Sequence, residues 1–259
     1  MPVRRVEVDL ASDRPFLRLL ASPRRVTSTL RLLSFWMQSY FAAQRRHQNT
    51  SCTVVETAAD ARVTPREQAV YPYLFACVFV SYAAWRLLDR LAPSAYRSSM
   101  AAFRELIGTA QQVFDAHPTR MRDRRRSEHP LMLYTQQVDG PTNCFPSLHV
   151  AIVTLAYQIL QAQGALSPEL AAAMRNSCID ICRSTMETKQ HSFVDVVGGL
   201  ELARRLYEKH FGEGYQDLSP AILGELDAVE QEALRSVCAR HDDLASLLPP
   251  LLATVQGFG

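Results

Sequence analysis

The sequence is poor in glycine, in net charge and in long apolar runs. Only 10 of its 259 residues are glycine, and the formal net charge is +2 at pH 7. Few glycines, together with many Ala, Leu, Arg, Gln and Glu residues, favour helices over strands. The small net charge argues against a nucleic-acid-binding protein. We therefore expect an all-α helical bundle in which any anion site is local.

The six cysteines form no pattern of a disulfide framework or a zinc site. Cys178 and Cys182 lie four residues apart, with no second pair and no histidine nearby, which indicates core thiols rather than metal ligands. Residues 1–16 lack the apolar segment of a secretory signal. These features predict a cytoplasmic protein without a bound metal.

The best candidate for a membrane span, the uncharged stretch at residues 71–85, is shorter than the ~20 residues that span a bilayer. The apolar run after Pro146 contains His149 and Gln158, which are costly in hydrocarbon. We therefore predict buried helices rather than membrane spans, with peripheral membrane contact left open.

Helical spacing and capping residues predict a series of helices. Ser167 and Ser219 each precede a proline, which is typical of an N-cap followed by the first helical position. The helices are expected at 28–44, 65–91, 94–115, 147–163, 168–186, 191–210, 220–241 and from 242 onward. Residues 116–145, with three prolines and several arginines, are expected to be a long irregular connection.

Two stretches carry titratable groups in a suggestive order. "NCFPSLHV" spans 143–150, and "STMETKQHSFVDVVGGL" spans 184–200. His191 and Asp195 are four residues apart, which on a helix places them side by side. A carboxylate bonded to one imidazole nitrogen makes the other nitrogen a better nucleophile. His149 supplies a second, separate histidine.

Two histidines and one carboxylate suit phosphoryl transfer, in which one histidine attacks phosphorus and the other protonates the leaving oxygen. Phosphoryl oxygens also need donors around them. The candidates are Arg120, Arg122 and Lys189, the Ser147 hydroxyl, and the backbone N–H groups at the start of the helix after Pro146.

"PSLH" followed by "KQH", with His191 42 residues after His149, resembles the type-2 phosphatidic acid phosphatase superfamily, which includes the vanadium haloperoxidases. The pattern is most similar to the branch with inositolphosphorylceramide-synthase-like proteins, and it covers about residues 118–200. The resemblance implies His191 as nucleophile, Asp195 as its orienting partner and His149 as general acid. Ser147 and the backbone after it would hold phosphate oxygens. The resemblance does not account for the first hundred residues or the tail. Because the composition becomes more acidic from Gln216 onward, we expect one helical catalytic domain at 1–215, with 216–259 as a helical appendage that packs on it.

The chain departs from the family pattern at two positions. In "HPTRMR" the first motif keeps Arg120 and Arg122 but lacks its lysine and its proline, and Arg122 is the preferred match. The family's second arginine corresponds to Thr185. On helical geometry, Lys189 is the better substitute for that charge than Arg183.

Each feature also has a plain structural interpretation. A lone histidine such as His149 is more often a core residue, and Arg124 to Arg126 are typical of a solvated loop. Cys144 is expected to be a packing residue, and Gly198 and Gly199 to allow close helix packing. In the appendage, one amphipathic helix is expected to bury four apolar residues: Ile222, Leu223, Leu226 and Val229.

The pattern as a whole predicts a metal-independent phosphatase or phosphotransferase. Its substrate would be a phosphate or diphosphate monoester with a lipid or isoprenyl tail, held near the aromatic residues Phe35, Trp36, Tyr73 and Phe75. No cofactor is expected. Three alternatives remain: a vanadate-dependent haloperoxidase, a biosynthetic enzyme that uses diphosphate for ionisation or transfer, and a non-catalytic binding protein. The sequence makes no prediction of the oligomeric state.

Overall fold

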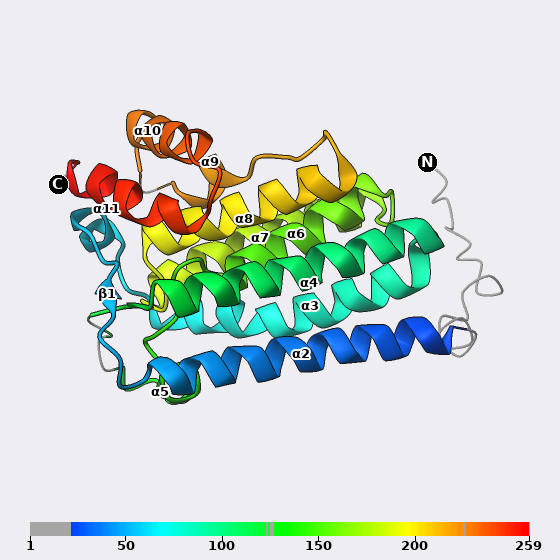
Figure 1. Cartoon of the computed structure of the whole chain (residues 1–259), viewed down its shortest axis with the longest axis horizontal. Coiled ribbons are helices and arrows are strands. Elements are labelled where there is room, and N and C mark those ends of the chain that lie inside the picture. Colours follow the sequence, from blue (N-terminus) through cyan, green and yellow to red (C-terminus); the bar gives the residue numbers. More distant parts are fainter. Residues whose placement is uncertain (1–21, 123, 125–126, 225, 259) are drawn as a thin grey trace, which may run out of the picture.

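A computed structural model describes residues 22–258, except 123, 125, 126 and 225. Long helices account for most of the chain, as expected for an all-α protein (Figure 1). The long helices are α2 (Pro23–His47), α3 (Val70–Arg90), α4 (Pro93–Ala116), α6 (Leu148–Ala162), α7 (Pro168–Glu187) and α8 (Phe193–Phe211). The shorter ones are α5 (Pro130–Val138), α9 (Ser219–Ile222), α10 (Ala228–Ala239) and α11 (Leu248–Gln256), with 3-10 turns η1 (Ala58–Arg62), η2 (Glu67–Ala69) and η3 (Ala245–Leu247).

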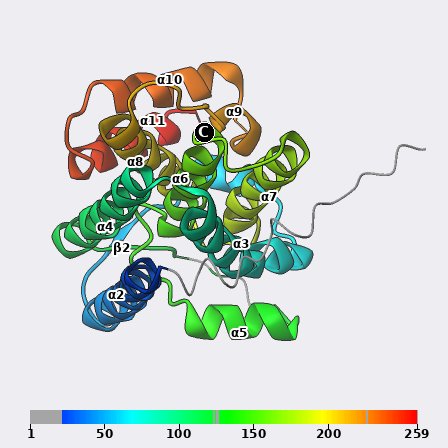
Figure 2. The same ribbon diagram turned by 90° about the vertical axis from the view of Figure 1, so that its right-hand side faces the viewer.

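Helix α6 is the centre of the bundle. It is apolar on all sides, and all its residues from Val150 to Leu160 are buried, which is the pattern of a helix surrounded by protein. It packs against α3, α4, α7 and α8. Figure 2, which looks along the bundle, shows α6 enclosed by these four helices, with α2 and α5 at one side and α9 to α11 at the other. The core therefore lies around α6.

A two-stranded parallel sheet ties the loops together at one end of the bundle. Strand β1 (Thr53–Val54) pairs with β2 (Thr119–Arg120), with Thr53 opposite Thr119. The buried Thr119 hydroxyl oxygen accepts hydrogen bonds from the N–H groups of Cys144 and Phe145, at 3.1 and 2.8 Å. This contact holds the loop that leads into α6.

The expectation of an irregular connection over 116–145 was wrong, because the segment contains β2 and α5. Helix α5 begins at Pro130, whose fixed φ suits the first turn of a helix. It buries Met132 and Thr135.

The expected single helix over 220–241 was also wrong, since the chain turns between α9 and α10. Asp227 caps α10 and forms a capping box with Glu230, so α10 starts anew there. Ile222, Leu223 and Leu226 are buried as predicted, whereas Val229 is 70% exposed. The C-terminal helices pack on α7, α8 and η1.

One helical segment, Glu67–Arg90, is long and apolar enough to cross a membrane by length and composition alone. Only 33% of its most apolar window is buried. The prediction of a fully buried helix was therefore only partly correct for α3, and its remaining face is exposed.

Candidate active site

The two sequence motifs meet where α6 and α8 begin. Ser147, the N-cap of α6, donates its backbone N–H to the carbonyl oxygen of Asp195 at 2.9 Å. A Cβ on Gly199 would lie 2.6 Å from the carbonyl oxygen of Ser147, and one on Gly198 would overlap the ring of Phe145. The prediction that this glycine pair allows close packing is confirmed.

His191 lies in the turn before α8 and not on the helix, so the predicted helical start at His191 was wrong. Ser192 is the N-cap of α8, and Asp195 closes a capping box by accepting the Ser192 N–H at 2.8 Å. This turn still brings Nδ1 of His191 to 3.6 Å from Oδ2 of Asp195. The expected pair therefore forms through a capping turn, and its distance is longer than a hydrogen bond.

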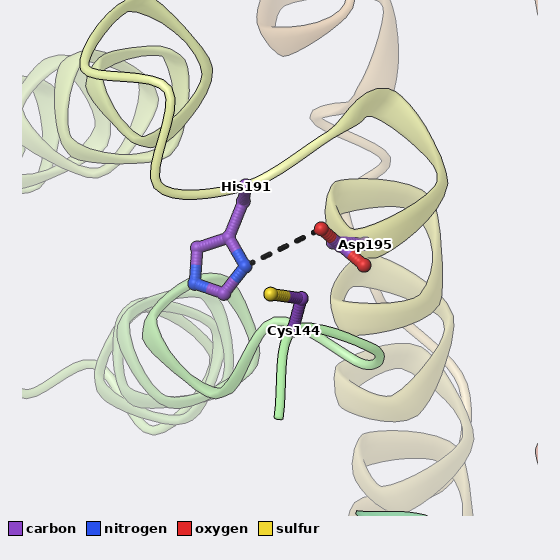
Figure 3. A group of neighbouring side chains, drawn as sticks. All are labelled: Cys144, His191 and Asp195. Carbon is purple, nitrogen blue, oxygen red and sulfur yellow. Dashed lines mark ion pairs between the residues drawn. The ribbon is translucent and has the colours of Figure 1, made fainter. Parts of the chain in front are cut away.

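Cys144 is the third group beside this pair. Figure 3 shows its sulfur below the imidazole of His191, on the side that faces Asp195. One ligand atom from each of Cys144, His191 and Asp195 lies within 4.8 Å of the others, and all three residues are buried. Thiolate, imidazole and carboxylate are the ligands that zinc prefers, so these residues could hold a metal ion.

His149 lies across from His191, with 6.1 Å between the ring centroids. Its ring packs at 4.6 Å on that of Tyr73. The pKa of His149 is lowered to about 4, mainly by burial; Asp139 opposes this shift and His191 adds to it. His149 is therefore neutral at pH 7 when no anion is bound beside it.

A carboxylate that the sequence patterns did not single out faces His149. Asp139, the residue after α5, accepts hydrogen bonds from the hydroxyls of Tyr40 and Tyr73. Burial by itself would raise the pKa of Asp139, but the charge of His149, the two tyrosine hydrogen bonds and Arg124 together lower it. Asp139 is thus a stable anion held by donors from α2 and α3.

Arg124 belongs to this cluster, so its interpretation as a solvated loop residue was wrong. Its guanidinium donates to the carbonyl oxygens of Asp139 and Gly140, the latter at 2.7 Å. Arg125 and Arg126, assigned to the same loop, lie outside the described residues.

The predicted phosphate-binding cations do not gather at the histidines. Arg120 and Arg122 are exposed, and no hydrogen bond or ion pair among the described residues joins either to His149 or His191. Lys189 has a positive φ of 56°, so the helical-phase argument for it fails. Its ammonium group donates to the carbonyl oxygen of Asp60 at 2.7 Å. Thr185 is fully buried, and its hydroxyl donates to the carbonyl oxygen of Cys182.

Asp60 connects the site to η1. Its carboxylate accepts the N–H of Phe193 at 2.9 Å and that of Thr57 at 2.8 Å, so it holds the first turn of α8. Burial raises the pKa of Asp60 to about 6, against the lowering effect of its hydrogen bonds and with a further contribution from Asp195. Asp60 therefore titrates near neutral pH.

Several buried polar atoms around the two histidines have no hydrogen-bond partner among the described residues. They are Nδ1 of His191, Oδ1 of Asp195, both amide atoms of Gln190 and Nε of Arg124. Buried polar groups in folded proteins are nearly always satisfied, so such a concentration points to a bound polar ligand. Gln190 is only 1% exposed and directly precedes His191.

An apolar cleft of about 160 Å³ ends at His149. Its walls come from α2, α3, α5 and the start of α6, and they include Trp36, Tyr40, Tyr73, Tyr134 and Asp139. Trp36 also lines a second apolar pocket of about 40 Å³ between α2, α3, α4 and α6. The walls of the cleft are therefore mostly apolar, but they also include the carboxylate of Asp139 and the imidazole of His149.

The sequence patterns missed Asp139, Tyr40, Asp60 and the role of Arg124. Asp139 stands in "VDGPTN", four residues before the first motif, and this proximity was a usable signal. Tyr40 and Asp60 lie roughly 80 to 110 residues before His149, and no local pattern joins them to it. Comparison with family models, curated proteins and solved structures found no match to this chain.

Proposed function

We propose that the protein is a metal-independent phosphatase or phosphotransferase acting on a phosphate or diphosphate monoester with an apolar tail. The observation that carries this proposal is a set of buried polar atoms at His191, Asp195 and Gln190 that have no hydrogen-bond partner among the described residues, together with an apolar cleft whose lining includes the neighbouring His149. A ligand with an anionic head and a hydrophobic tail satisfies both features. The sequence resemblance to the type-2 phosphatidic acid phosphatase superfamily supports the same chemistry.

In the proposed reaction, Nε2 of His191 uses its lone pair to form a bond to phosphorus, and the bond from phosphorus to the leaving oxygen breaks. Asp195 faces Nδ1 at 3.6 Å, orients the ring and stabilises the positive charge that develops on it. Water or an acceptor alcohol then attacks the phosphohistidine, which breaks the N–P bond and frees His191. Water as acceptor gives hydrolysis, and an alcohol gives transfer.

His149 is the proposed general acid, so it must be protonated while the substrate is bound. The low pKa of about 4 applies to the protein without substrate, because burial disfavours the imidazolium. A phosphate dianion bound beside the ring offsets that cost, because an opposite charge nearby favours the protonated form. Proton uptake therefore accompanies substrate binding, and the proton passes to the leaving oxygen.

The phosphate donors proposed here differ from those expected from the motif. Arg124 replaces Arg120 and Arg122, because it is the arginine whose charge reaches Asp139, Tyr73 and Cys144. Ser147 and the first-turn N–H groups of α6 keep their proposed role at the phosphate. Lys189 contributes charge from the turn before His191.

The first experiment measures phosphate or pyrophosphate release from lipid and isoprenyl phosphates and diphosphates without added metal. His191→Asn and His149→Asn are compared with His117→Asn, a matched change at an exposed histidine. We expect His149→Asn to lose 10²–10⁴-fold, the usual contribution of a general acid, and His191→Asn to lose more. Undiminished release by His191→Asn would refute the mechanism.

A second candidate function follows from Cys144, His191 and Asp195, which have the composition of a metal site. A metal there would occupy the nitrogen that faces Asp195, so turnover would vanish with a chelator and return with zinc. Unchanged turnover in the chelator favours the phosphohistidine route. Bromide oxidation on addition of vanadate and peroxide would instead support the haloperoxidase alternative.

Binding without turnover is the third outcome. It is favoured by Thr185, which places a neutral side chain where the family resemblance expects an arginine. Phosphate binding by wild type with no release from any substrate would establish it. A cytoplasmic location stays a prediction for all these functions.

A further inference from the structure

Exposed hydrophobic side chains are concentrated on one side of the protein. Of the twelve large hydrophobic residues exposed within the described part of the chain, ten lie on α2, α3 and α5. They are Leu30, Phe35, Met37, Tyr71, Phe75, Val78, Leu131, Leu133, Tyr134 and Val138. Soluble proteins rarely expose such concentrations without a partner.

Helices α3 and α5 form the centre of this surface. On α3, Tyr71, Phe75 and Val78 follow the spacing i, i+4, i+7, so they form one outward stripe opposite the buried residues of the same helix. Helix α5 carries no charged residue and exposes apolar side chains along its length. Figure 2 shows α5 at the lower edge of the molecule, outside the packed bundle.

The charges on these helices have one sign. Helices α2, α3 and α5 contain seven arginines and a single carboxylate, Asp89, whose side chain is 1% exposed. Arg31 and Arg45 are exposed on α2. Exposed acidic residues lie just before α3 and α5, at Glu67 and Glu128, and on the C-terminal segment, which Figure 2 shows at the opposite side. Those on the C-terminal segment include Asp227, Glu232, Asp242 and Asp243.

We propose that the outward faces of α2, α3 and α5, here called the docking face, bind the surface of an anionic lipid bilayer. An uncharged helix that exposes leucine and tyrosine beside arginines matches the apolar and cationic requirements of interfacial binding. Tyr134 and Met37 belong both to this surface and to the cleft that leads to His149. If the proposed function holds, an apolar tail passes from the bilayer into the cleft without crossing water.

The test is cosedimentation of the full chain with vesicles of phosphatidylcholine mixed with phosphatidylserine, and with vesicles of phosphatidylcholine alone. The docking-face variant combines Phe75→Gln, Leu131→Gln and Leu133→Gln, none of which lines the cleft. The control is Val229→Gln, a similar change at an exposed residue of α10. Circular dichroism verifies that both variants remain folded.

We expect wild type and Val229→Gln to bind the mixed vesicles, and the docking-face variant to bind at least ~10-fold more weakly, because it loses buried apolar area. High salt should weaken wild-type binding, because salt screens the attraction between the arginines and the anionic lipids. Equal binding by the docking-face variant, or no binding by wild type, would overturn the proposal. So would a stable dimer in which Phe75 is protected from solvent.

Failure of docking and failure of the proposed function give different results. His191→Asn is expected to bind vesicles like wild type while it releases no phosphate. Turnover of a short-chain, water-soluble phosphate ester without vesicle binding would support the function and refute docking. Vesicle binding without turnover of any ester would support docking and refute the proposed function.

Discussion

The two walls of the site differ in almost every physical respect. The inner wall, formed by α6, α7 and α8, is buried and carries His191 and Asp195 in a turn held by backbone hydrogen bonds. The outer wall, formed by α2, α5 and the outward face of α3, exposes apolar side chains and borders the cleft. The inner wall thus fixes the positions of the two groups that we propose to react, whereas the outer wall exposes hydrophobic surface.

Close packing and exposed apolar surface therefore lie on different helices. Close packing around α6 fixes the geometry of the turn before α8, since Ser147, Asp195 and Gly199 are in direct backbone contact. The exposed apolar residues of the outer wall contribute little to the core, whereas Leu32, Trp36 and Tyr40 of α2 pack against it. We therefore expect substitutions in the inner wall to change stability and those in the outer wall to change binding.

The largest effect is expected from matched phenylalanine truncations. Phe145 is fully buried, whereas Phe75 on α3 is 44% exposed. Phe145→Ala should lower the free energy of unfolding by about 3–5 kcal/mol through lost burial and a cavity. Phe75→Ala should change it by only about 0.5 kcal/mol, as surface substitutions do. Denaturant unfolding measures both, and similar costs would contradict the distinction between the walls.

A smaller effect is expected from adding a methyl group to glycine. Gly198→Ala places a Cβ against the ring of Phe145, and overpacking of this kind costs about 1–3 kcal/mol. Gly108→Ala on α4 is the control, because its Cβ would meet no atom within 4 Å. That change should stabilise by about 0.5–1 kcal/mol through helix propensity.

A double-mutant cycle tests the cause of that cost. In the Phe145→Ala background the ring is absent, so Gly198→Ala should become nearly neutral. If the two changes are additive, the cost arises from a contact other than the Phe145 ring.

The smallest effect is expected in the pH dependence of stability, to which His149 and Asp60 contribute in opposite directions. The pKa of His149 is lowered from 6.5 to about 4, so the unfolded state binds the extra proton between these values and stability falls as pH falls. The pKa of Asp60 is raised from 3.8 to about 6, so the folded state binds the extra proton and stability falls as pH rises. Between pH 4 and 6 the two slopes nearly cancel.

Asp60→Asn removes the contribution of Asp60 to the change of the unfolding free energy with pH. Stability should then decrease on acidification from pH 6 to pH 4 by up to about 1.4 kcal/mol per pH unit more than in wild type. The readout is the pH slope of the unfolding free energy, because the absolute value also reflects the lost hydrogen bonds to Thr57 and Phe193. Asp115→Asn, at a half-exposed carboxylate, is the control. An unchanged slope in Asp60→Asn would contradict the shifted pKa.

Local patterns predicted the helices of the bundle well but did not identify the capping boxes that set the starts of α8 and α10. Helices α4, α6 and α7 begin and end within one or two residues of the prediction, because propensity and apolar spacing are local. Helix α8 starts after His191, since the Ser192 and Asp195 capping box decides the boundary. In the same way, the capping box of Asp227 and Glu230 starts α10 as a separate helix in the C-terminal segment.

The candidate site was predicted only in part. His149, His191 and Asp195 were identified together, because two short motifs carry them, and they do lie close together. The positively charged residue of the site was not identified. Arg120 and Arg122 were chosen from their spacing, but they lie in a loop whose path depends on β2 and α5. Asp139, Tyr40 and Tyr73 meet only after α2, α3 and the end of α5 pack together.

Three features could be predicted from the sequence alone: the all-α class, the burial of the apolar helix after Pro146, and the proximity of His191 and Asp195. Each depends on residues close together in the chain, whose periodicity or capping acts locally. Only the tertiary structure decided which cation and which carboxylate face His149, and which helices expose their apolar sides. Those features depend on contacts between distant segments such as α2 and α5, and local residue preferences do not specify such contacts.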